Sequence, residues 1–352
     1  MLALQKLKEG FSKIIQSQSV QLHFLENNNG LKVGICNYGA RITHFFVPDK
    51  GNTDIVLGFD NLEGYLNATE RYHGVTVGPF ANRINDAQFI LDGITHQLEA
   101  NNGKNSLHGG SSGFHNKIWD ILEVERNTIT LKVTNSDREG GFPGNLACQI
   151  TFTLTNENEL RMDYSAISDQ NTVINLTNHA YFNLNGAGNG DILNHQVKID
   201  ADEFVEIDET CIPTGKLLKV ADGAFDFRKP KPIGQDINIE NDQLLMGNGY
   251  DHSFVLNKNE NDFTFAATAK GDLTAITLEV YTTEPAMQFY TGNFLNDLDK
   301  GKMGKIYKAR TGFCFETQHH PDSPNQPQFP STFLAANQEF KSATVYKIIL
   351  PE

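Results

Sequence analysis

The sequence predicts an all-β protein, a large antiparallel β-sandwich with a short helix at its N-terminus. Two observations lead to this fold class: apolar and polar residues alternate along most of the chain, and clusters of Gly, Pro and Asn separate the alternating runs. Of the 352 residues, 39% are hydrophobic and 20% are charged, a composition typical of globular proteins that bury a large core. Many short strands joined by tight turns, with few helical stretches, favour a sandwich.

Three runs carry the alternation most clearly. Residues 128–134, 146–155 and 276–281 each place an apolar side chain at every second position, with mostly polar residues between. Because neighbouring side chains of a strand point to opposite faces, each run predicts a strand with one buried face. Turns that could join such strands occur at residues 27–30, 140–144 and 186–190.

The N-terminal segment departs from this pattern. Its apolar residues recur at helical spacing, and lysines occupy several of the positions between them. These apolar residues are Leu4, Leu7, Phe11, Ile14 and Ile15. We therefore predict an amphipathic helical extension over residues 1–18, docked on an edge of the sandwich rather than serving as a membrane or targeting segment. No change of composition and no repeat divides the remainder, so residues 19–352 are expected to form a single domain.

The charge balance and the cysteines limit the partners and the compartment. Lys and Arg number 29 against 43 Asp and Glu, a formal net charge of -14, so the surface repels nucleic acid and anionic membranes. No run approaches the roughly 18 apolar residues of a membrane span, and no signal peptide is recognisable. The four cysteines form no CxxC pair or zinc-like cluster and are expected to be free thiols. We therefore predict a cytoplasmic protein.

Two loops carry candidate ligand-binding residues. A Gly-Pro pair at residues 78–79 ends a strand and leaves Asn82 and Arg83 displayed beyond it, where the guanidinium could grip sugar hydroxyls or simply be solvated. In the second loop, residues 101–110, His108 stands before two glycines that permit close approach to a ligand but also occur in ordinary turns. Neither loop identifies a function by itself.

A third segment, residues 175–184, is expected to be a strand with one polar and one largely apolar face. A row of hydrogen-bonding side chains on a sheet suits a polyhydroxylated ligand, although an ordinary solvated face would look the same. The polar face would carry Asn175, Thr177, His179, Tyr181 and Asn183.

Two carboxylates complete the candidates. Asp251 follows a glycine turn at the start of an apolar strand, where it could cap the turn or bind sugar hydroxyls. Glu316 alternates with Phe313 and Phe315 on a predicted strand, and this aromatic backing favours a carboxylate that acts as a base near neutral pH. The adjacent histidines at 319–320 would point to opposite faces of a strand, so we expect no metal site there.

In chain order, nine blocks are similar to blocks of one known family, from near residue 20 to the C-terminus. They are GPFANRI, NSLHGG, DREGGFPGNL, NLTNHAYFNL, DETCIPTGKL, FDFRKP, GYDHSF, EPAMQFYTGNF and GFCFETQHHPDSPNQPQFP. Together they resemble the galactose mutarotase (aldose 1-epimerase) family. The helical extension precedes the usual start of that family.

The resemblance implies a β-sandwich whose concave sheet holds a sugar. It implies an isomerase that interconverts the α and β anomers of free hexoses such as D-galactose and D-glucose, without a cofactor or a metal, as a monomer or a homodimer. By matching motif residues, Glu316 would be the general base and His179 the general acid. The residues that would bind the sugar are Asn82, Arg83, His108, Asp251 and Gln288.

The candidate residues, considered without the resemblance, leave three alternative functions open. Asp251 and Glu316 could form the carboxylate pair of a glycosidase, although His179 on a polar face fits that chemistry less well. A phosphosugar epimerase would normally place more cations around its phosphate than Arg83 supplies. A sugar sensor or lectin-like module without catalysis would need no acid–base pair.

Overall fold

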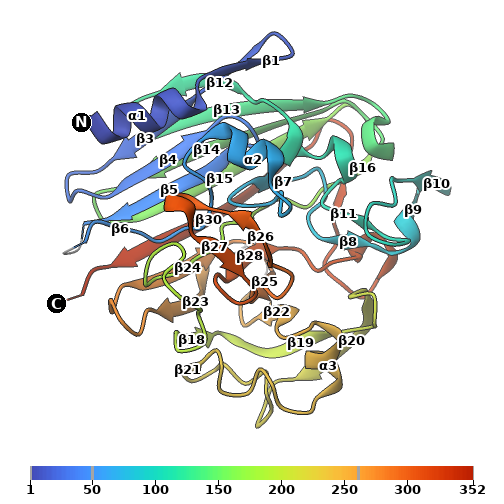
Figure 1. Cartoon of the computed structure of the whole chain (residues 1–352). Helices are drawn as coiled ribbons and strands as arrows, with labels where there is room; N and C mark the ends of the chain where they lie inside the picture. The colour runs from blue at the N-terminus through green and yellow to red at the C-terminus, as the bar shows by residue number, and fades with distance from the viewer. Residues whose placement is uncertain (1, 49–50, 260–261, 352) are drawn as a thin grey trace.

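Two large antiparallel sheets form the body of the molecule in the computed structural model, which describes residues 2–48, 51–259 and 262–351 (Figure 1). The larger sheet has nine strands in the order β12-β13-β14-β15-β30-β24-β23-β18-β21, and the smaller has five in the order β20-β19-β22-β25-β28. This arrangement confirms the predicted all-β fold class.

The strands of the larger sheet are β12 (Asp120–Val124), β13 (Thr128–Asn135), β14 (Leu146–Leu154), β15 (Glu159–Ser168), β30 (Glu339–Ile349), β24 (Thr277–Thr282), β23 (Thr264–Lys270), β18 (Gln196–Ile199) and β21 (Lys231–Pro232). Those of the smaller sheet are β20 (Pro213–Lys219), β19 (Ala201–Ile207), β22 (Asp251–Leu256), β25 (Ala286–Tyr290) and β28 (Cys314–Gln318).

Alternating burial explains why these segments form strands. In β14 every second residue from Leu146 to Leu154 is buried, and β13 and β24 coincide with the other two predicted runs. Apolar side chains of both sheets meet in one main core whose members extend in sequence from Leu25 to Ile348. We propose on this basis that residues 19–352 form a single domain.

The five-stranded sheet turns one face to this core and the other to a cavity. In β28, Phe315 packs into the core against Phe289 of β25, with ring centroids 5.4 Å apart. Glu316, the next residue, points to the opposite face and lines the cavity, as the predicted alternation requires. The register places Ser253, Gln288 and Glu316 in one row across β22, β25 and β28.

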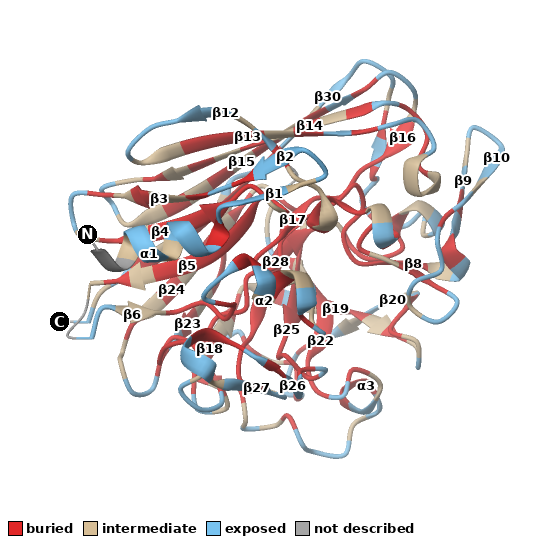
Figure 2. Ribbon diagram, turned by 45° about the horizontal axis from the view of Figure 1, so that its top comes forward, coloured by how far each residue is buried: buried red, intermediate tan, exposed pale blue. Residues whose placement is uncertain are grey.

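A four-stranded sheet, several strand pairs and three α-helices cover the remaining sides. The sheet contains β3 (Leu22–Glu26), β4 (Lys32–Cys36), β5 (Arg41–Val47) and β6 (Thr53–Asp54). The pairs are β1 (Lys13–Ile15) with β2 (Gln18–Val20), β7 (Thr76–Val77) with β17 (Thr177–Asn178), β8 (Arg83–Ile84) with β11 (Ser106–Leu107), β9 (Gln88–Leu91) with β10 (Ile94–Gln97), β16 (Thr172–Val173) with β29 (Phe333–Leu334), and β26 (Asn296–Lys300) with β27 (Ile306–Lys308). The α-helices are α1 (Leu2–Phe11), α2 (Leu62–Asn67) and α3 (Asp242–Met246). Figure 2 shows burial concentrated along β22, β25 and β28, with exposed residues on outlying hairpins such as β9–β10.

The N-terminal helix is shorter than the sequence predicted. α1 ends at Phe11, and residues 13–20 form the β1–β2 hairpin instead of continuing the helix to residue 18. Gly10 weakens the end of the helix, and the two β-branched isoleucines at 14–15 favour a strand. Residues 16–17 then adopt positive φ angles of 47° and 66°, which suit a tight turn.

α1 nevertheless docks on the sandwich, as expected. Phe11 is fully buried, and its ring centroid lies 5.8 Å from that of Tyr65 in α2 and 6.4 Å from that of His44 in β5. Figure 1 shows the helix lying beside β3. Among the described residues, none of the helices has the length and apolar character needed to cross a bilayer.

We expect Phe11→Ala to lower the free energy of unfolding by about 3–5 kcal/mol, because it removes a fully buried aromatic side chain and leaves a cavity. The matched control is Ile14→Ala in the hairpin, where the side chain is 74% exposed. That change should stay within about 0.5 kcal/mol. Urea denaturation of the two variants checks both values, and equal losses would contradict the docking of α1.

Candidate active site

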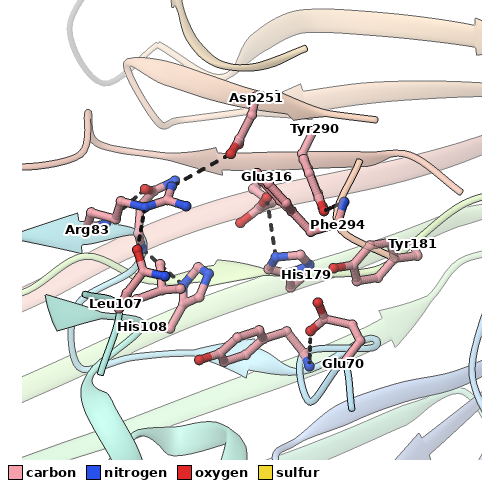
Figure 3. A pocket seen from close by; sticks show the side chains of 13 residues that line it. Glu70, Arg83, Leu107, His108, His179, Tyr181, Asp251, Tyr290, Phe294 and Glu316 are labelled. Atoms are coloured by element: carbon pink, nitrogen blue, oxygen red, sulfur yellow. Dashed lines mark hydrogen bonds and ion pairs between the residues drawn. The ribbon is translucent and has the colours of Figure 1, made fainter. Parts of the chain in front are cut away.

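A cavity of about 250 Å³ opens on the face of the five-stranded sheet that is turned away from the core (Figure 3). Its volume lies just below the range of about 300–1,000 Å³ that is common for drug-sized ligands, so it suits a smaller molecule. Strands β22, β25 and β28 form one wall, and loops next to β7, β8, β11 and β17 form the others. The lining residues are Glu70, Tyr72, Asn82, Arg83, Asn102, Leu107, His108, His179, Tyr181, Asp251, Tyr290, Phe294 and Glu316.

Glu316 and His179 face each other across this cavity. His179 Nε2 lies 3.6 Å from Glu316 Oε1, and the two side chains are only 5% and 2% exposed. On the other side of the imidazole, Nδ1 lies 3.5 Å from Cys314 Sγ. Burial raises the pKa of the Cys314 thiol, which therefore keeps its hydrogen and can donate it to Nδ1. A neutral His179 then carries its own hydrogen on Nε2, directed at Glu316.

Burial shifts the pKa values of this pair in opposite directions. It lowers the pKa of His179 to about 3. It raises the pKa of Glu316 well above its usual range, an effect that Asp251 reinforces and Arg83 opposes. Both shifts favour uncharged groups, a neutral imidazole and a protonated carboxyl.

Asn82 and His108 hold two loops together at one side of the cavity. The Asn82 N–H donates to His108 Nδ1 and the His108 N–H donates to the Asn82 carbonyl, both at 3.1 Å. Both residues have positive φ angles, 65° and 53°. Gly109 must be glycine, because a Cβ there would lie 2.7 Å from the Gly78 carbonyl oxygen. The His108 ring thus reaches the cavity from a constrained backbone, and its neutral form carries its hydrogen on Nε2.

Arg83 and Asp251 form a partly buried polar group beside the catalytic candidates. Arg83 Nη1 lies 3.7 Å from Asp251 Oδ2, and Arg83 Nε donates to Asn102 Oδ1 at 3.0 Å. Gln288 Nε2 donates to Asp251 Oδ1 at 2.7 Å. The Asp251 carboxylate is therefore oriented by an ion pair and an amide, and it keeps lone pairs for a ligand.

The structure brings six of the seven predicted site residues to the cavity. They are Asn82, Arg83, His108, His179, Asp251 and Glu316. Gln288 is the exception: it lies in the same row as Glu316, but its side chain is 2% exposed and bonds Asp251 instead of lining the cavity. Its role as a direct sugar ligand stays a prediction; in this arrangement Gln288 supports Asp251 from behind.

The prediction that residues 175–184 form one strand with a polar face was wrong. Only Thr177–Asn178 is a strand, and the segment is buried on both sides because it runs between other chain segments. Asn175 and Asn183 do not reach the cavity. The Asn175 amide donates to the carbonyls of Ala81 and His319. The Asn183 amide donates to the carbonyls of Gly190 and Thr311.

The adjacent histidines at 319–320 bind separate partners. His319 Nδ1 lies 2.7 Å from Glu284 Oε2, and His320 Nδ1 lies 2.8 Å from Ser253 Oγ. They share no ligand position, which agrees with the prediction that they form a poor chelate.

Within the part of the chain that the structure describes, one cluster could hold a metal by distance. Single ligand atoms of His108, His179 and Glu316 all lie within 4.8 Å of one another. Nδ1 of His108, however, accepts the Asn82 N–H, so a neutral His108 carries a hydrogen on Nε2 that a metal bound there would have to displace. The cluster therefore suits hydrogen bonding to a ligand better than metal coordination.

Sequence reasoning missed part of the cavity. Glu70 and Tyr72 come from a stretch without a motif, just before β7, and Tyr290 and Phe294 lie in a block that was recognised without these residues being singled out. The only available signal was the position of Glu70 and Tyr72 next to an apolar strand. That signal is common to many surface residues.

With this geometry in view, comparison with known proteins is decisive. The model of the family described as aldose 1-epimerase matches residues 21–347. The chain belongs to the aldose 1-epimerase family. This confirms the resemblance on which the sequence interpretation rested. The matched region starts after β2, so α1 and the β1–β2 hairpin lie before the part shared with the family.

Relatives in the aldose 1-epimerase family cover nearly the whole chain. The galactose mutarotase of Bos taurus is 43% identical over 326 residues, 92% of this chain and 93% of the relative. The aldose 1-epimerase of Escherichia coli is 35% identical over 94% of this chain and 96% of its own length. Among solved structures, a GalM/aldose epimerase homologue from C. elegans superimposes with a TM-score of 0.86 at 30% identity, covering 95% of this chain and 100% of that one.

We expect ¹⁵N NMR at about pH 6 to find His108 and His179 neutral, with the hydrogen of each ring on Nε2. Burial lowers both pKa values, so the charged forms would appear only at much lower pH. Cys314→Ala should weaken the tautomer preference of His179 while leaving that of His108 intact, because only His179 loses a donor to Nδ1. A His179 hydrogen on Nδ1 in the unaltered protein would contradict this assignment.

Proposed function

We propose that this protein interconverts the α and β anomers of free aldohexoses such as D-galactose and D-glucose, without a cofactor or a metal. Its class, an isomerase acting on sugars, follows from its family. The observation that carries the proposal is the Glu316–His179 pair, whose facing atoms are 3.6 Å apart in a cavity of about 250 Å³. Anomer exchange requires one base and one acid acting on neighbouring oxygens, and this pair supplies both.

The reaction begins with the pair in its charged form, Glu316 as carboxylate and His179 as imidazolium. Glu316 removes the proton of the C1 hydroxyl while His179 protonates the ring oxygen, so the C1–O5 bond breaks and C1 becomes an aldehyde. Rotation about the C1–C2 bond presents the other face of the carbonyl. Ring closure then returns the Glu316 proton to the carbonyl oxygen and the O5 proton to His179.

The opposite pKa shifts fit this cycle. Ring opening leaves Glu316 protonated and His179 neutral, the charge states that burial favours in the pocket. Because Nε2 faces the cavity and gives up its proton, the hydrogen that stays on the ring is then on Nδ1, where Cys314 Sγ can accept it. Burial therefore stabilises the enzyme form that accompanies the open-chain sugar. Closure on either face regenerates the charged pair without any proton from solvent. The total number of protons on the pair and the sugar stays constant throughout.

The groups beside the pair would hold the sugar. Arg83 and Asp251 lie close enough to receive two adjacent hydroxyls, one donating to the carboxylate and one accepting from the guanidinium. His108 offers a donor at Nε2 from a constrained loop. These contacts fix the ring so that C1 and O5 stay near Glu316 and His179.

The rival glycosidase reaction receives less support. A glycosidase would use Asp251 as the partner of Glu316, but Asp251 is engaged by Arg83 and Gln288. The decisive experiment is polarimetry on freshly dissolved α-D-galactose and α-D-glucose. If the protein accelerates the change in optical rotation over buffer alone, the epimerase is supported; if it does not, the proposal is wrong. Release of p-nitrophenol from an aryl galactoside would favour the glycosidase instead.

A cytoplasmic location is part of the proposal. All four cysteines are buried and unpaired, as a reducing compartment would leave them. Both a monomer and a homodimer are compatible with the site, because all the groups that the mechanism uses come from one chain.

We expect Glu316→Gln and His179→Gln each to reduce kcat by about 10²- to 10⁴-fold, because each removes one proton-transfer group while keeping its approximate shape. KM should change only a few-fold. Polarimetric initial rates give kcat, and calorimetric titration with D-galactose gives the affinity. Retention of more than about a tenth of kcat, or a loss confined to KM, would show that the altered residue binds sugar rather than moving protons.

Arg83→Lys should reduce kcat/KM by about 100-fold, since lysine keeps the charge but lacks the fork that reaches two acceptors and so misplaces the sugar. The pH optimum should not move, because the substitution keeps a positive charge at this position. Arg126→Lys, at an exposed turn, is the matched control. A displaced optimum would instead give Arg83 a role in tuning Glu316.

A further inference from the structure

Glu70 is a carboxyl group in the cavity that the mechanism above does not use. It accepts a hydrogen bond from the Tyr72 N–H at 2.8 Å, and its side chain also bonds that of Tyr181. Its own N–H and that of Thr69 donate to the two oxygens of Asp299 at 2.9 and 2.7 Å. The Glu70 carboxyl is thus fixed from both sides and lines the cavity.

The charge of the cavity makes this group unusual. Among the described lining residues, three carboxyl groups, Glu70, Asp251 and Glu316, share one guanidinium, Arg83. Arg83 is paired with Asp251. Glu70 therefore has no cation among the lining residues, and burial raises its pKa to about 7. Of the other charged groups around it, Asp299 raises this pKa and the more distant Arg41 lowers it.

The geometry of a pyranose ring indicates what Glu70 would meet. In such a ring, C3 and C4 lie across from O5 and C1, and C5 with its substituent is next to O5. Figure 3 shows Arg83 and His108 on one side of the Glu316–His179 pair, and Glu70 with Tyr181 on the other. If Arg83 and Asp251 receive the hydroxyls of C3 and C4, C1 and O5 reach the pair and the C5 substituent projects toward Glu70.

We propose that Glu70 is a specificity-determining residue that bonds the C6 hydroxyl of the sugar and rejects sugars that carry a negative charge at C6. This inference rests on the proposed function. A neutral hydroxymethyl group can donate to Glu70, whereas the carboxylate of a uronic acid would face an uncompensated carboxylate in a buried site. Tyr181 and the Tyr72 N–H hold Glu70 in place for this contact.

The discrimination depends on pH with a defined sign. A carboxyl group with a raised pKa is neutral below that value and charged above it, so Glu70 repels an anionic sugar only as the pH rises through about 7. The unaltered protein should therefore discriminate more strongly against D-galacturonate at about pH 8 than at about pH 6.

The test compares three sugars that differ only at C6: D-galactose, its 6-deoxy analogue D-fucose, and D-galacturonate. Polarimetric kcat/KM values are measured for the unaltered protein, Glu70→Gln and Glu70→Ala. We expect the unaltered protein to prefer D-galactose to D-fucose about tenfold, and Glu70→Ala to bring that ratio near unity. Glu70→Gln should keep D-galactose within a few-fold and improve D-galacturonate about tenfold or more at pH 8.

Glu123→Gln in the exposed strand β12 removes the same charge far from the cavity and should change none of these ratios. The gain on D-galacturonate is informative because a damaged protein cannot produce it. Equal losses on all three sugars in both Glu70 variants, or an unchanged D-galacturonate rate in Glu70→Gln, would overturn the inference. If the unaltered protein accelerated none of the neutral sugars, the proposed function itself would fail, which is a different outcome.

Discussion

The packing of Phe315 against Phe289 determines where the chemistry can take place. Because neighbouring residues of a strand point to opposite faces, the burial of Phe315 in the main core places Glu316 in the cavity. A shift of β28 by one residue would bury the carboxylate in the core and expose the aromatic ring. The hydrophobic effect thus holds the Glu316 carboxyl group at a fixed depth, although the ring of Phe315 does not line the cavity.

The second requirement is electrostatic. A carboxyl and an imidazole placed together at low exposure both lose the stabilisation that water gives to their charged forms. Burial therefore moves the balance between the two forms of the pair away from the charged form and toward the neutral one. A reaction that moves one proton onto Glu316 and another off His179 can run in both directions between such states, which suits an isomerase better than an enzyme with a one-way reaction.

The fold class and most of the candidate site could be predicted because they depend on patterns among residues that are close in sequence. Runs such as Leu146–Leu154 alternate because one face is buried, and that pattern survives in any antiparallel sheet. The same alternation correctly predicted that Phe315 and Glu316 point to opposite faces of their strand. The alternation was misleading for residues 175–184, because this segment is buried on both sides and its polar residues do not mark a solvent-exposed face. The end of α1 was missed for a related reason, since helical spacing cannot distinguish a further helical turn from a short hairpin.

Two side chains show what no local pattern could supply. Gln288 belongs to the same row as Glu316, yet its amide bonds Asp251 of the neighbouring strand β22. Glu70 reaches the cavity from a loop without a motif, and its contacts with Tyr72 and Tyr181 hold its carboxyl group there. Both follow from tertiary packing, which the linear sequence contains only implicitly.

The linked backbones of Asn82 and His108 limit how this protein can change over time. Each residue holds a left-handed conformation that most side chains avoid, and each is fastened to the other by two hydrogen bonds. Both groups that Asn82 contributes to these bonds belong to its backbone, so a replacement there keeps the bonds but strains the left-handed conformation. A replacement of His108 also removes the acceptor of the Asn82 N–H. Both positions should therefore tolerate few side chains, and laboratory evolution of new sugar preferences has more freedom on the opposite wall, where Phe294 is 50% exposed.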